Sequence, residues 1–553
     1  MKITTVVQKL LTKSQAILNR KSSSILSAAT IIAASFLLSA FLGLVRNRLL
    51  AARFFGGLEG DLDVYFAAFI IPDTIFQLLV VGAVSAAFIP IYQGYLNKSV
   101  RKANFMANTA LSLVTITLLI FSVIIAVFAR PLSLLLSHYT GSQLDLMVNL
   151  IRLMSVAQIF FSISAFLTGV LQAHRRFLIP AIAPLFYNLG TILGILILTP
   201  YIGIYAAAAG VIFGSFLHVI VQLPAAIHTG YVLRFRLRFN HKGVRRMLRL
   251  MPPRSFSLAL VQVERIVSLN IASALSAGSF TIFNFARQVY VLPISLFGVS
   301  LGQASFPTLA EEALNKDQSK FADTLGKTIL QIFFFCLPAA ILILILRIPI
   351  VRIIFGARNF PWEATLLTGK ALAIFSLSIA PQAAVQLLTR AFYAQKNTRT
   401  PFIINIATLI LFILTSYLFT YTFSWGILGM STAMSLSNAI NFLILYLTIR
   451  ATLPSLGITL EIIKMLFVSV LTSFALWIPM RLLDQFVFDT TRTVPLLILT
   501  ITVSLIGLVV YFGLANLLKV KQYADVRRLF VKLGNWRQVL GETDEVIETP
   551  IVG

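Results

Sequence analysis

Long apolar runs follow one another along almost the whole of this chain, and their length constrains the fold more than any other feature. A helix needs about 20 apolar residues to cross the hydrocarbon core of a bilayer. Hydrophobic residues make up 58% of the 553 residues and charged residues only 12%, whereas soluble domains average roughly 25% charged residues. The chain is therefore predicted to be an all-α polytopic membrane protein with 14 transmembrane helices, at 25–51, 63–92, 105–129, 146–172, 179–200, 203–227, 251–276, 281–310, 322–347, 364–394, 401–421, 426–450, 460–482 and 494–517.

Basic residues outnumber acidic ones by 45 to 19, and they concentrate in short loops between the apolar runs. Every second loop is the basic one, which is typical of loops that stay in the cytoplasm. The pattern predicts that both termini are cytoplasmic, and it explains the charge without nucleic-acid binding. Outside the membrane we expect a basic N-terminus at 1–24, a basic linker at 231–250 that contacts anionic lipid, and an amphipathic tail at 519–553.

A sequence repeat divides the predicted membrane helices into two sets. Residues 167–180 read LTGVLQAHRRFLIP and residues 388–401 read LTRAFYAQKNTRTP, with the same spacing from threonine to proline. In each segment an apolar helix leads into a basic turn, and a proline opens the next helix. We therefore predict two homologous six-helix lobes, at 25–230 and 251–450, followed by two C-terminal helices within 451–518. Because six spans separate equivalent helices, the lobes have the same orientation, and a cavity between them is the default substrate site.

Several charged residues fall inside the apolar runs, where an ionised side chain costs at least about 2.5 kcal/mol. Such residues normally face a water-filled cavity or a partner, so they are candidates for a functional site. Arginine suits a phosphate ligand because its guanidinium donates two parallel hydrogen bonds. The acidic members are expected either to orient the arginines or to titrate and couple transport to an ion. The predicted substrate-binding residues are Arg46, Arg48, Asp63, Glu264, Arg265, Arg287 and Arg390, with Asp73 as a further acidic residue in the same apolar run as Asp63.

Nothing in the sequence indicates catalysis or a resident cofactor. The single cysteine, Cys336, lies in the apolar run IFFFCLPAAILI and is expected to be a buried packing residue. The five histidines are scattered without the spacing of metal ligands, and no phosphate-binding loop or HExxH pattern is present. The sequence therefore predicts a transporter and not an enzyme, with no metal site.

Five motifs resemble the MurJ/MviN family of lipid II flippases, which belongs to the multidrug/oligosaccharidyl-lipid/polysaccharide exporter superfamily. They read LGLVRNRLLAARFFG from residue 42, DVYFAAFIIPD and GAVSAAFIPIY within 63–92, FNFARQVYVLPISLFGVSLGQASFPTL from residue 283, and RAFYAQKNTRTP from residue 390. The resemblance implies a flippase of the bacterial cytoplasmic membrane. Its substrate would be lipid II, an undecaprenyl-pyrophosphate-linked peptidoglycan precursor, moved from the inner to the outer leaflet by alternating access without ATP hydrolysis.

The resemblance also implies roles for single residues. Arg46 matches the arginine of the family's first helix, and Asp63 matches the acidic residue that opens its second helix. The chain departs from the family at Ala40 and Phe76, where members often carry arginines, and at Arg287, where an acidic-basic pair is expected.

Three other functions stay open at this point. An O-antigen-type polysaccharide-lipid flippase faces the same pyrophosphate, whereas a cation-coupled drug antiporter of the same superfamily should have twelve helices and an acidic cavity. A silent membrane scaffold is compatible with the missing family arginines. We expect a monomer whose partners are the lipid-linked substrate and membrane lipids, and coupling to the membrane potential or to a monovalent ion is left open.

Overall fold

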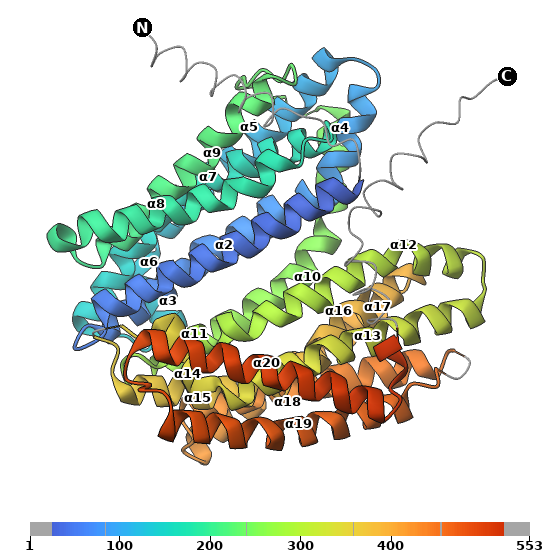
Figure 1. Ribbon diagram of the computed structural model, residues 1–553. Helices are drawn as coiled ribbons and strands as arrows, with labels where there is room; N and C mark the ends of the chain where they lie inside the picture. Colours follow the sequence, from blue (N-terminus) through green and yellow to red (C-terminus); the bar gives the residue numbers. More distant parts are fainter. Residues whose placement is uncertain (1–24, 83, 239, 358, 454–455, 525–553) are drawn as a thin grey trace, which may run out of the picture. The chain divides into compact units, whose positions relative to one another are not determined.

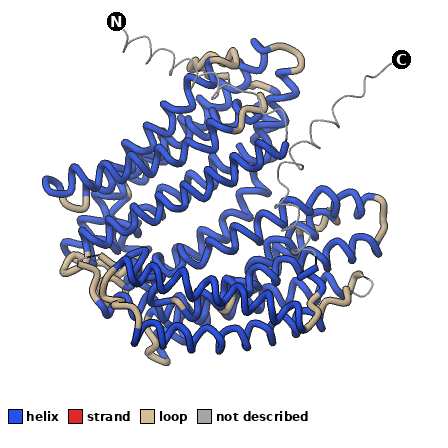
Figure 2. Tube along the Cα trace, in the orientation of Figure 1, coloured by secondary structure: helices blue, strands red, loops and turns tan. Residues whose placement is uncertain are grey.

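The computed structural model describes residues 25–82, 84–238, 240–357, 359–453 and 456–524. In these residues helices alternate with short loops and no strand occurs (Figure 2). The predicted N-terminal segment 1–24 and most of the predicted tail, from residue 525, lie outside the described residues. In chain order the helices (Figure 1) are α2 (Ile25–Phe54), α3 (Glu59–Phe76), η1 (Gln77–Val81), η2 (Val84–Phe88), α4 (Ile89–Leu96), α5 (Val100–Val127), α6 (Ala129–Leu136), α7 (Gly141–Ala173), α8 (Leu178–Ile202), α9 (Tyr205–Ile227), α10 (Lys242–Ser273), α11 (Ser279–Pro293), η3 (Ile294–Val299), α12 (Ser300–Leu314), α13 (Gln318–Ile345), α14 (Arg347–Phe355), α15 (Trp362–Ser376), α16 (Ile379–Ala394), α17 (Arg399–Tyr417), η4 (Leu418–Thr422), α18 (Ile427–Arg450), α19 (Thr459–Phe486) and α20 (Thr493–Leu517).

The all-α membrane fold is confirmed, whereas the exact count of 14 spans is not. Among the described residues, 12 helices are long and apolar enough to cross a membrane. The count rises to 13 if α15 and α16, which meet at an angle of 48°, form one broken span. The other predicted span, 251–276, overlaps α10, a helix of 32 residues, from Met251 to Ser273. Glu264 and Arg265 lie within this stretch.

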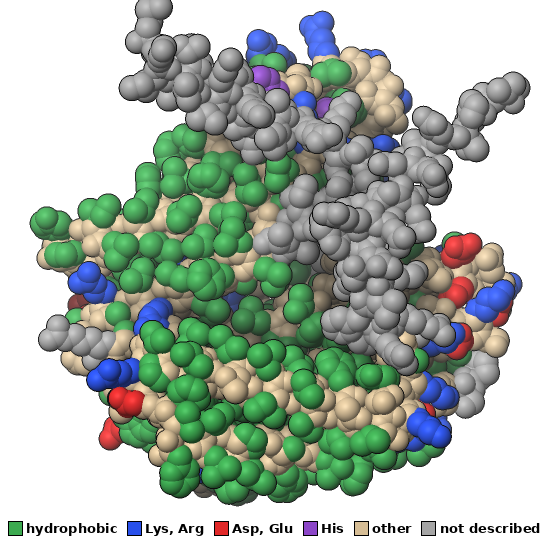
Figure 3. Space-filling view, viewed as in Figure 1, with side chains coloured by type: hydrophobic (Ala, Val, Ile, Leu, Met, Phe, Trp, Pro, Cys, Tyr) green, Lys and Arg blue, Asp and Glu red, His purple; other side chains and the backbone are tan. Residues whose placement is uncertain are grey.

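Several helices turn large apolar side chains outward, as lipid contact requires. Phe474 on α19 and Val509 on α20 are 68% and 72% exposed, and Ile197 on α8 is 59% exposed. Figure 3 shows hydrophobic side chains spread over these helices, with charged side chains mostly near helix ends. A water-soluble protein rarely exposes contiguous apolar patches of this kind, so the surrounding solvent of these faces is lipid.

The chain forms two compact units, each built from separate stretches of sequence. Unit 1 contains Met1–Phe285, Ile354–Thr368 and Ile413–Met430, and unit 2 contains Ala286–Ile353, Gly369–Phe412 and Ser431–Gly553. In unit 1 α7 packs on α3, α5 and α9, and in unit 2 α13 packs on α12, α16 and α19. Compactness and sequence homology are different properties, so the division into homologous lobes at residue 250 stays a prediction.

Equivalent stretches of the two halves nevertheless share unusual backbone features. Arg175 and Lys396, which occupy the same place in the repeated segments, have φ angles of 58° and 60°. Helices α5 and α13 both have 28 residues, and each ends in a bend at one residue. The bend residues, Phe128 and Leu346, have φ and ψ of −92° and 16° and of −91° and 17°. The repeat is therefore visible in backbone conformation well beyond the two motifs that predicted it.

A third pair of equivalent turns precedes α5 and α13. Both turns read Leu-Asn-Lys, at 96–98 and at 314–316. The first is followed by the N-cap residue Ser99 and the second by the N-cap residue Asp317. The Asp317 carboxylate accepts a hydrogen bond of 3.0 Å from the Lys320 backbone N–H, and this bond lowers the pKa of Asp317.

The predicted linker at 231–250 has two distinct parts in the structure. Its first part is a non-helical segment held against α5 by Asn108. The Asn108 side chain accepts a hydrogen bond from the Tyr231 hydroxyl at 2.7 Å and donates one to the Val232 carbonyl at 2.7 Å. Its second part is already helical, because α10 begins at Lys242. The basic residues after 241 thus belong to the first turns of a long helix.

Helices α8 and α9 approach each other closely through two pairs of glycines. A Cβ atom on Gly190 would lie 2.5 Å from the Cα of Gly214, and one on Gly194 would lie 2.4 Å from the Cα of Gly210. Both helices thus carry two glycines four residues apart, the small-residue spacing that lets membrane helices pack backbone to backbone.

We expect Gly194→Ala to lower the stability of the protein by about 1–3 kcal/mol, because the new methyl group must push α8 away from α9. The measurement is the melting temperature of the purified protein in detergent. Gly513→Ala on α20 is the matched control, since a Cβ atom at Gly513 would meet nothing within 4 Å. Equal melting temperatures for the two variants would contradict close packing at this contact.

Candidate functional site

The first polar cluster of unit 1 surrounds Arg46 on α2. Its guanidinium donates from Nη1 to Asn188 Oδ1 on α8 at 3.2 Å and from Nε to Asn47 Oδ1 at 3.2 Å. Asn188 in turn donates to the carbonyl and hydroxyl oxygens of Ser39, both at 3.2 Å. The guanidinium carbon also lies 5.9 Å from the centre of the Tyr187 ring. All of these partners are neutral, so the positive charge of Arg46 is held in place without being cancelled.

The second cluster joins α3 to α10 through an ion pair. Arg265 Nη1 lies 2.5 Å from Asp73 Oδ2, and the two side chains are only 27% and 15% exposed. The same Nη1 atom donates to Gln262 Oε1 at 3.2 Å, and Thr74 donates to that oxygen at 3.2 Å. Gln77 completes the cluster by donating to Asp73 Oδ1 at 3.4 Å. Glu264 and Asp63 were the acidic residues predicted to orient the arginines. In the structure the carboxylate that pairs with Arg265 is that of Asp73.

Tyr187 connects the two clusters electrostatically, because the charges of Arg46 and Asp73 both act on its hydroxyl group. Its ring lies 5.2 Å from that of Phe161 on α7, and Phe161 lies 5.9 Å from Phe76 on α3. Aromatic rings therefore flank the charged groups. Arginine, carboxylate and amide groups in an aromatic surrounding form a site suited to binding a polar headgroup and not to covalent chemistry.

Asp63 contacts the start of α11, and its predicted part in the substrate site stays a prediction. Its carboxylate, 2% exposed, accepts hydrogen bonds of 2.7 Å from the backbone N–H groups of Gly278 and Thr281. These groups lie at the start of α11, so Asp63 satisfies amides that the helix itself leaves without partners. No contact with Arg46 occurs among the described residues, and the position is that of a buried structural acid.

The other predicted site residues are divided between the two units. Arg48 and Glu264 are half-buried in unit 1, and Arg287 is half-buried in unit 2. Arg390, also in unit 2, donates from Nη1 to the carbonyl oxygen of Val299 at 2.8 Å. Val299 ends the π-helical segment η3, where the regular backbone hydrogen bonds of an α-helix are interrupted. The bond from Arg390 gives the Val299 carbonyl oxygen a partner there.

Three residues that complete the two clusters were not predicted: Asn188, Tyr187 and Gln262. Tyr187 and Asn188 lie on α8 and Gln262 lies on α10. The fold brings Asn188 beside Arg46, which is 142 residues away, and Gln262 lies three residues before Arg265 on its own helix. The one available signal was an amide side chain in a membrane helix, where polar side chains normally bond across helices.

We expect a double-mutant cycle on Asp73→Ala and Arg265→Ala to give a coupling free energy of about 1–3 kcal/mol, because removing one partner leaves a half-buried charge alone. The readout is the free energy of unfolding in detergent. The exposed pair Arg130 and Asp145, at 2.9 Å and about 60% exposed, is the matched control and should give about 0–1 kcal/mol. A coupling no larger than that of the control would show that the inner pair does not stabilise the α3–α10 contact.

Comparisons with known proteins show what this chain is similar to. Residues 50–499 match the family model described as lipid II flippase MurJ. The lipid II flippase MurJ of Burkholderia cenocepacia is 30% identical over 427 residues, which cover 75% of this chain and 81% of that protein. The probable lipid II flippase MurJ of Bdellovibrio bacteriovorus is 26% identical over 519 residues, which cover 92% of this chain and 98% of that protein.

Solved structures show the same fold. A lipid II flippase MurJ in an inward closed conformation gives a TM-score of 0.72 at 23% identity and covers 88% of this chain and 99% of that one. An inward-facing multidrug resistance transporter of the MATE family, in the MOP superfamily, gives a TM-score of 0.63 at 13% identity and covers 76% of this chain and 96% of that one. At these identities the likeness concerns the fold alone.

Proposed function

The chain belongs to the MurJ family of lipid II flippases, and we propose that it carries lipid II across the bilayer by binding the pyrophosphate group at Arg46. It is a multi-pass protein of the bacterial inner membrane and a transporter, not an enzyme. The membrane barrier to lipid II is largely the barrier to its pyrophosphate, since charged groups are costly in a medium of low dielectric constant. A cationic group inside the membrane lowers that cost.

The observation that carries the assignment of Arg46 is the neutrality of its partners. Asn47 and Asn188 orient the guanidinium but bring no negative charge, whereas Arg265 is already paired with Asp73. Arg46 therefore keeps a net charge for an incoming phosphate, and a guanidinium binds phosphate oxygens with two parallel charge-assisted hydrogen bonds. Arg265 supports the site by fixing α10 against α3.

We further propose that the protein works as a monomer with both termini in the cytoplasm and moves lipid II outward. The alternation of basic and less basic loops supports this orientation. Outward movement of an anionic headgroup is favoured by a membrane potential that is negative inside, by about 2.3 kcal/mol per charge for each 100 mV. The potential is thus a sufficient source of direction for the proposed transport, and a coupled ion would add to it.

The test is to express the chain in a bacterial strain depleted of its own lipid II flippase, with membrane levels followed by immunoblot. We expect growth to be restored and lipid II to become accessible at the outer leaflet. Lipid-linked O-antigen units are measured in parallel, because an O-antigen-type flippase would move those instead. Normal membrane levels without lipid II at the outer leaflet would refute the proposal.

A further inference from the structure

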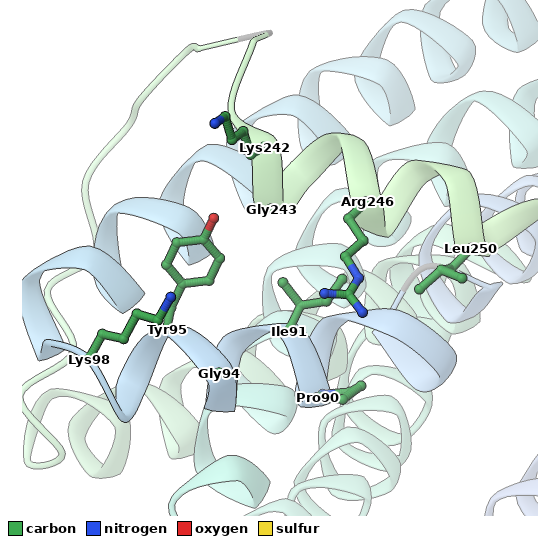
Figure 4. A pocket seen from close by; sticks show the side chains of 9 residues that line it. All are labelled: Pro90, Ile91, Gly94, Tyr95, Lys98, Lys242, Gly243, Arg246 and Leu250. Carbon is green, nitrogen blue, oxygen red and sulfur yellow. The ribbon is translucent and has the colours of Figure 1, made fainter.

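A pocket with a cavity volume of about 510 Å³ opens between α4 and the first turns of α10, within unit 1 (Figure 4). Gly94 and Gly243 keep it open. A Cβ atom at Gly94 would meet nothing within 4 Å, whereas one at Gly243 would lie 2.7 Å from the ring of Tyr95. The Tyr95 ring thus rests against the start of α10, and the space beside Gly94 stays unfilled. This pocket is separate from the polar clusters around Arg46 and Arg265.

The charged side chains of the pocket are all basic. Lys98 comes from the turn after α4, and Lys242 and Arg246 come from α10. None of the three makes an ion pair with a carboxylate among the described residues. The sequence explains this, because it contains no Asp or Glu between Asp73 and Asp145 or between Asp145 and Glu264. The stretches that line the pocket, 90–98 and 242–250, therefore carry positive charge and contain no carboxylate side chain.

Two further features agree with an anionic occupant. The pocket lies at the N-terminal end of α10, a helix of 32 residues with no acidic residue in its first turn, so the backbone amides there add positive potential. The N-cap residue His241 contributes no charge near neutral pH, since burial and the charge of Arg238 lower its pKa. The fixed charges of the lysines and the arginine therefore set the field of the pocket.

The pocket also has apolar lining residues, Pro90, Ile91 and Leu250. Figure 4 shows the Arg246 guanidinium reaching from α10 toward Pro90 and Ile91 on α4. We propose that this pocket binds a phosphate group. Lys98, Lys242 and Arg246 would hold the phosphate oxygens, and Pro90, Ile91 and Leu250 would contact the apolar group that the phosphate carries. A phospholipid headgroup with its first methylene groups matches both the basic and the apolar lining residues, whereas a soluble phosphate compound matches the basic residues alone.

The experiment places a reporter in the pocket of the full-length protein. Gly94→Cys introduces a thiol where there is space for it, and the native Cys336 is buried, so a neutral maleimide reports on position 94. Alkylation rates are measured in micelles containing phosphatidylglycerol, in micelles containing phosphatidylcholine, and in micelles of neutral detergent with inorganic phosphate. We expect phosphatidylglycerol to slow alkylation at least about fivefold and phosphatidylcholine to have little effect. Protection by inorganic phosphate alone would identify a soluble phosphate compound as the occupant.

Charge variants decide whether the protection comes from the proposed site. Adding Lys98→Gln and Arg246→Gln should weaken the apparent affinity for phosphatidylglycerol about 25-fold, at about fivefold for each charge near an anionic lipid. Lys316→Gln, at the equivalent Leu-Asn-Lys turn of the second half, is the matched control and should leave protection unchanged. If the double change unfolds the protein, loss of protection at about 1 M salt supports the site instead. Alkylation that neither anion slows, or protection that survives both the charge changes and the salt, would overturn the proposal.

Discussion

Arg46→Ala is expected to lower lipid II flipping by about one to two orders of magnitude while the protein still folds. A hydrogen bond to a charged group contributes roughly 1.5–3 kcal/mol, and each 1.36 kcal/mol corresponds to about a tenfold change in rate. Arg46→Lys should recover only part of the rate, because lysine keeps the charge but loses the paired geometry of the guanidinium. The measurement is complementation of the flippase-depleted strain together with the membrane level of each variant.

Arg130→Ala is the control for this prediction. Arg130 is also an arginine of unit 1, but it is 61% exposed and pairs with Asp145 at a helix end. We expect it to complement like the unchanged protein. Normal growth with Arg46→Ala would refute a role in transport, and loss of the protein from the membrane would show that Arg46 is needed for the α2–α8 contact through Asn188 instead.

Asp63→Ala is expected to reduce the free energy of unfolding by about 2–5 kcal/mol. The substitution leaves the buried N–H groups of Gly278 and Thr281 without their acceptor, and an unsatisfied buried group costs about 1–3 kcal/mol. Asp63→Asn should reduce the free energy of unfolding less than Asp63→Ala does. The asparagine amide keeps one oxygen acceptor but presents an N–H₂ group to the second donor. Melting temperature in detergent and membrane level both report the loss.

Asp61→Ala controls for the removal of a carboxylate from the same helix. Asp61 lies two residues earlier on α3 and is half-buried, and its carboxylate makes no hydrogen bond among the described residues. Its substitution should change the melting temperature little. A variant Asp63→Ala that is as stable as the unchanged protein but fails to transport would contradict the structural role and restore the predicted one in the substrate site.

Features that depend on neighbouring residues could be predicted from the sequence. The length of an apolar run predicts a span, so most helices lie where they were expected, and the repeated basic turns end at Pro180 and Pro401, each the third residue of its helix. The burial of Cys336 was also predicted correctly, because an apolar helix segment offers a thiol no polar partner. The bend at 377–378 between α15 and α16 lies just before Pro381, and a proline inside a helix removes a backbone hydrogen bond and kinks it.

Features that depend on distant residues could not be predicted in this way. Asp73 and Arg265 are 192 residues apart, and Asp63 and Gly278 are 215 residues apart. A single sequence shows which residues carry charge but not which of many possible partners the fold brings near. The sequence therefore identified the charged residues inside the apolar runs, but not the contacts of Asp63 with Gly278 or of Arg46 with Asn188. The roles of these residues in the substrate site stay predictions.

The two Leu-Asn-Lys turns share their sequence but differ in backbone conformation, since Lys316 has a φ of 57°, and they differ in the charges around them. The turn at 96–98 lies in a stretch of sequence without any acidic residue, whereas four carboxylates accompany the turn at 314–316, those of Glu311, Glu312, Asp317 and Asp323. Because Lys98 has no acidic neighbour in the sequence and Lys316 has four, mobile anions are concentrated around the first turn more than around the second.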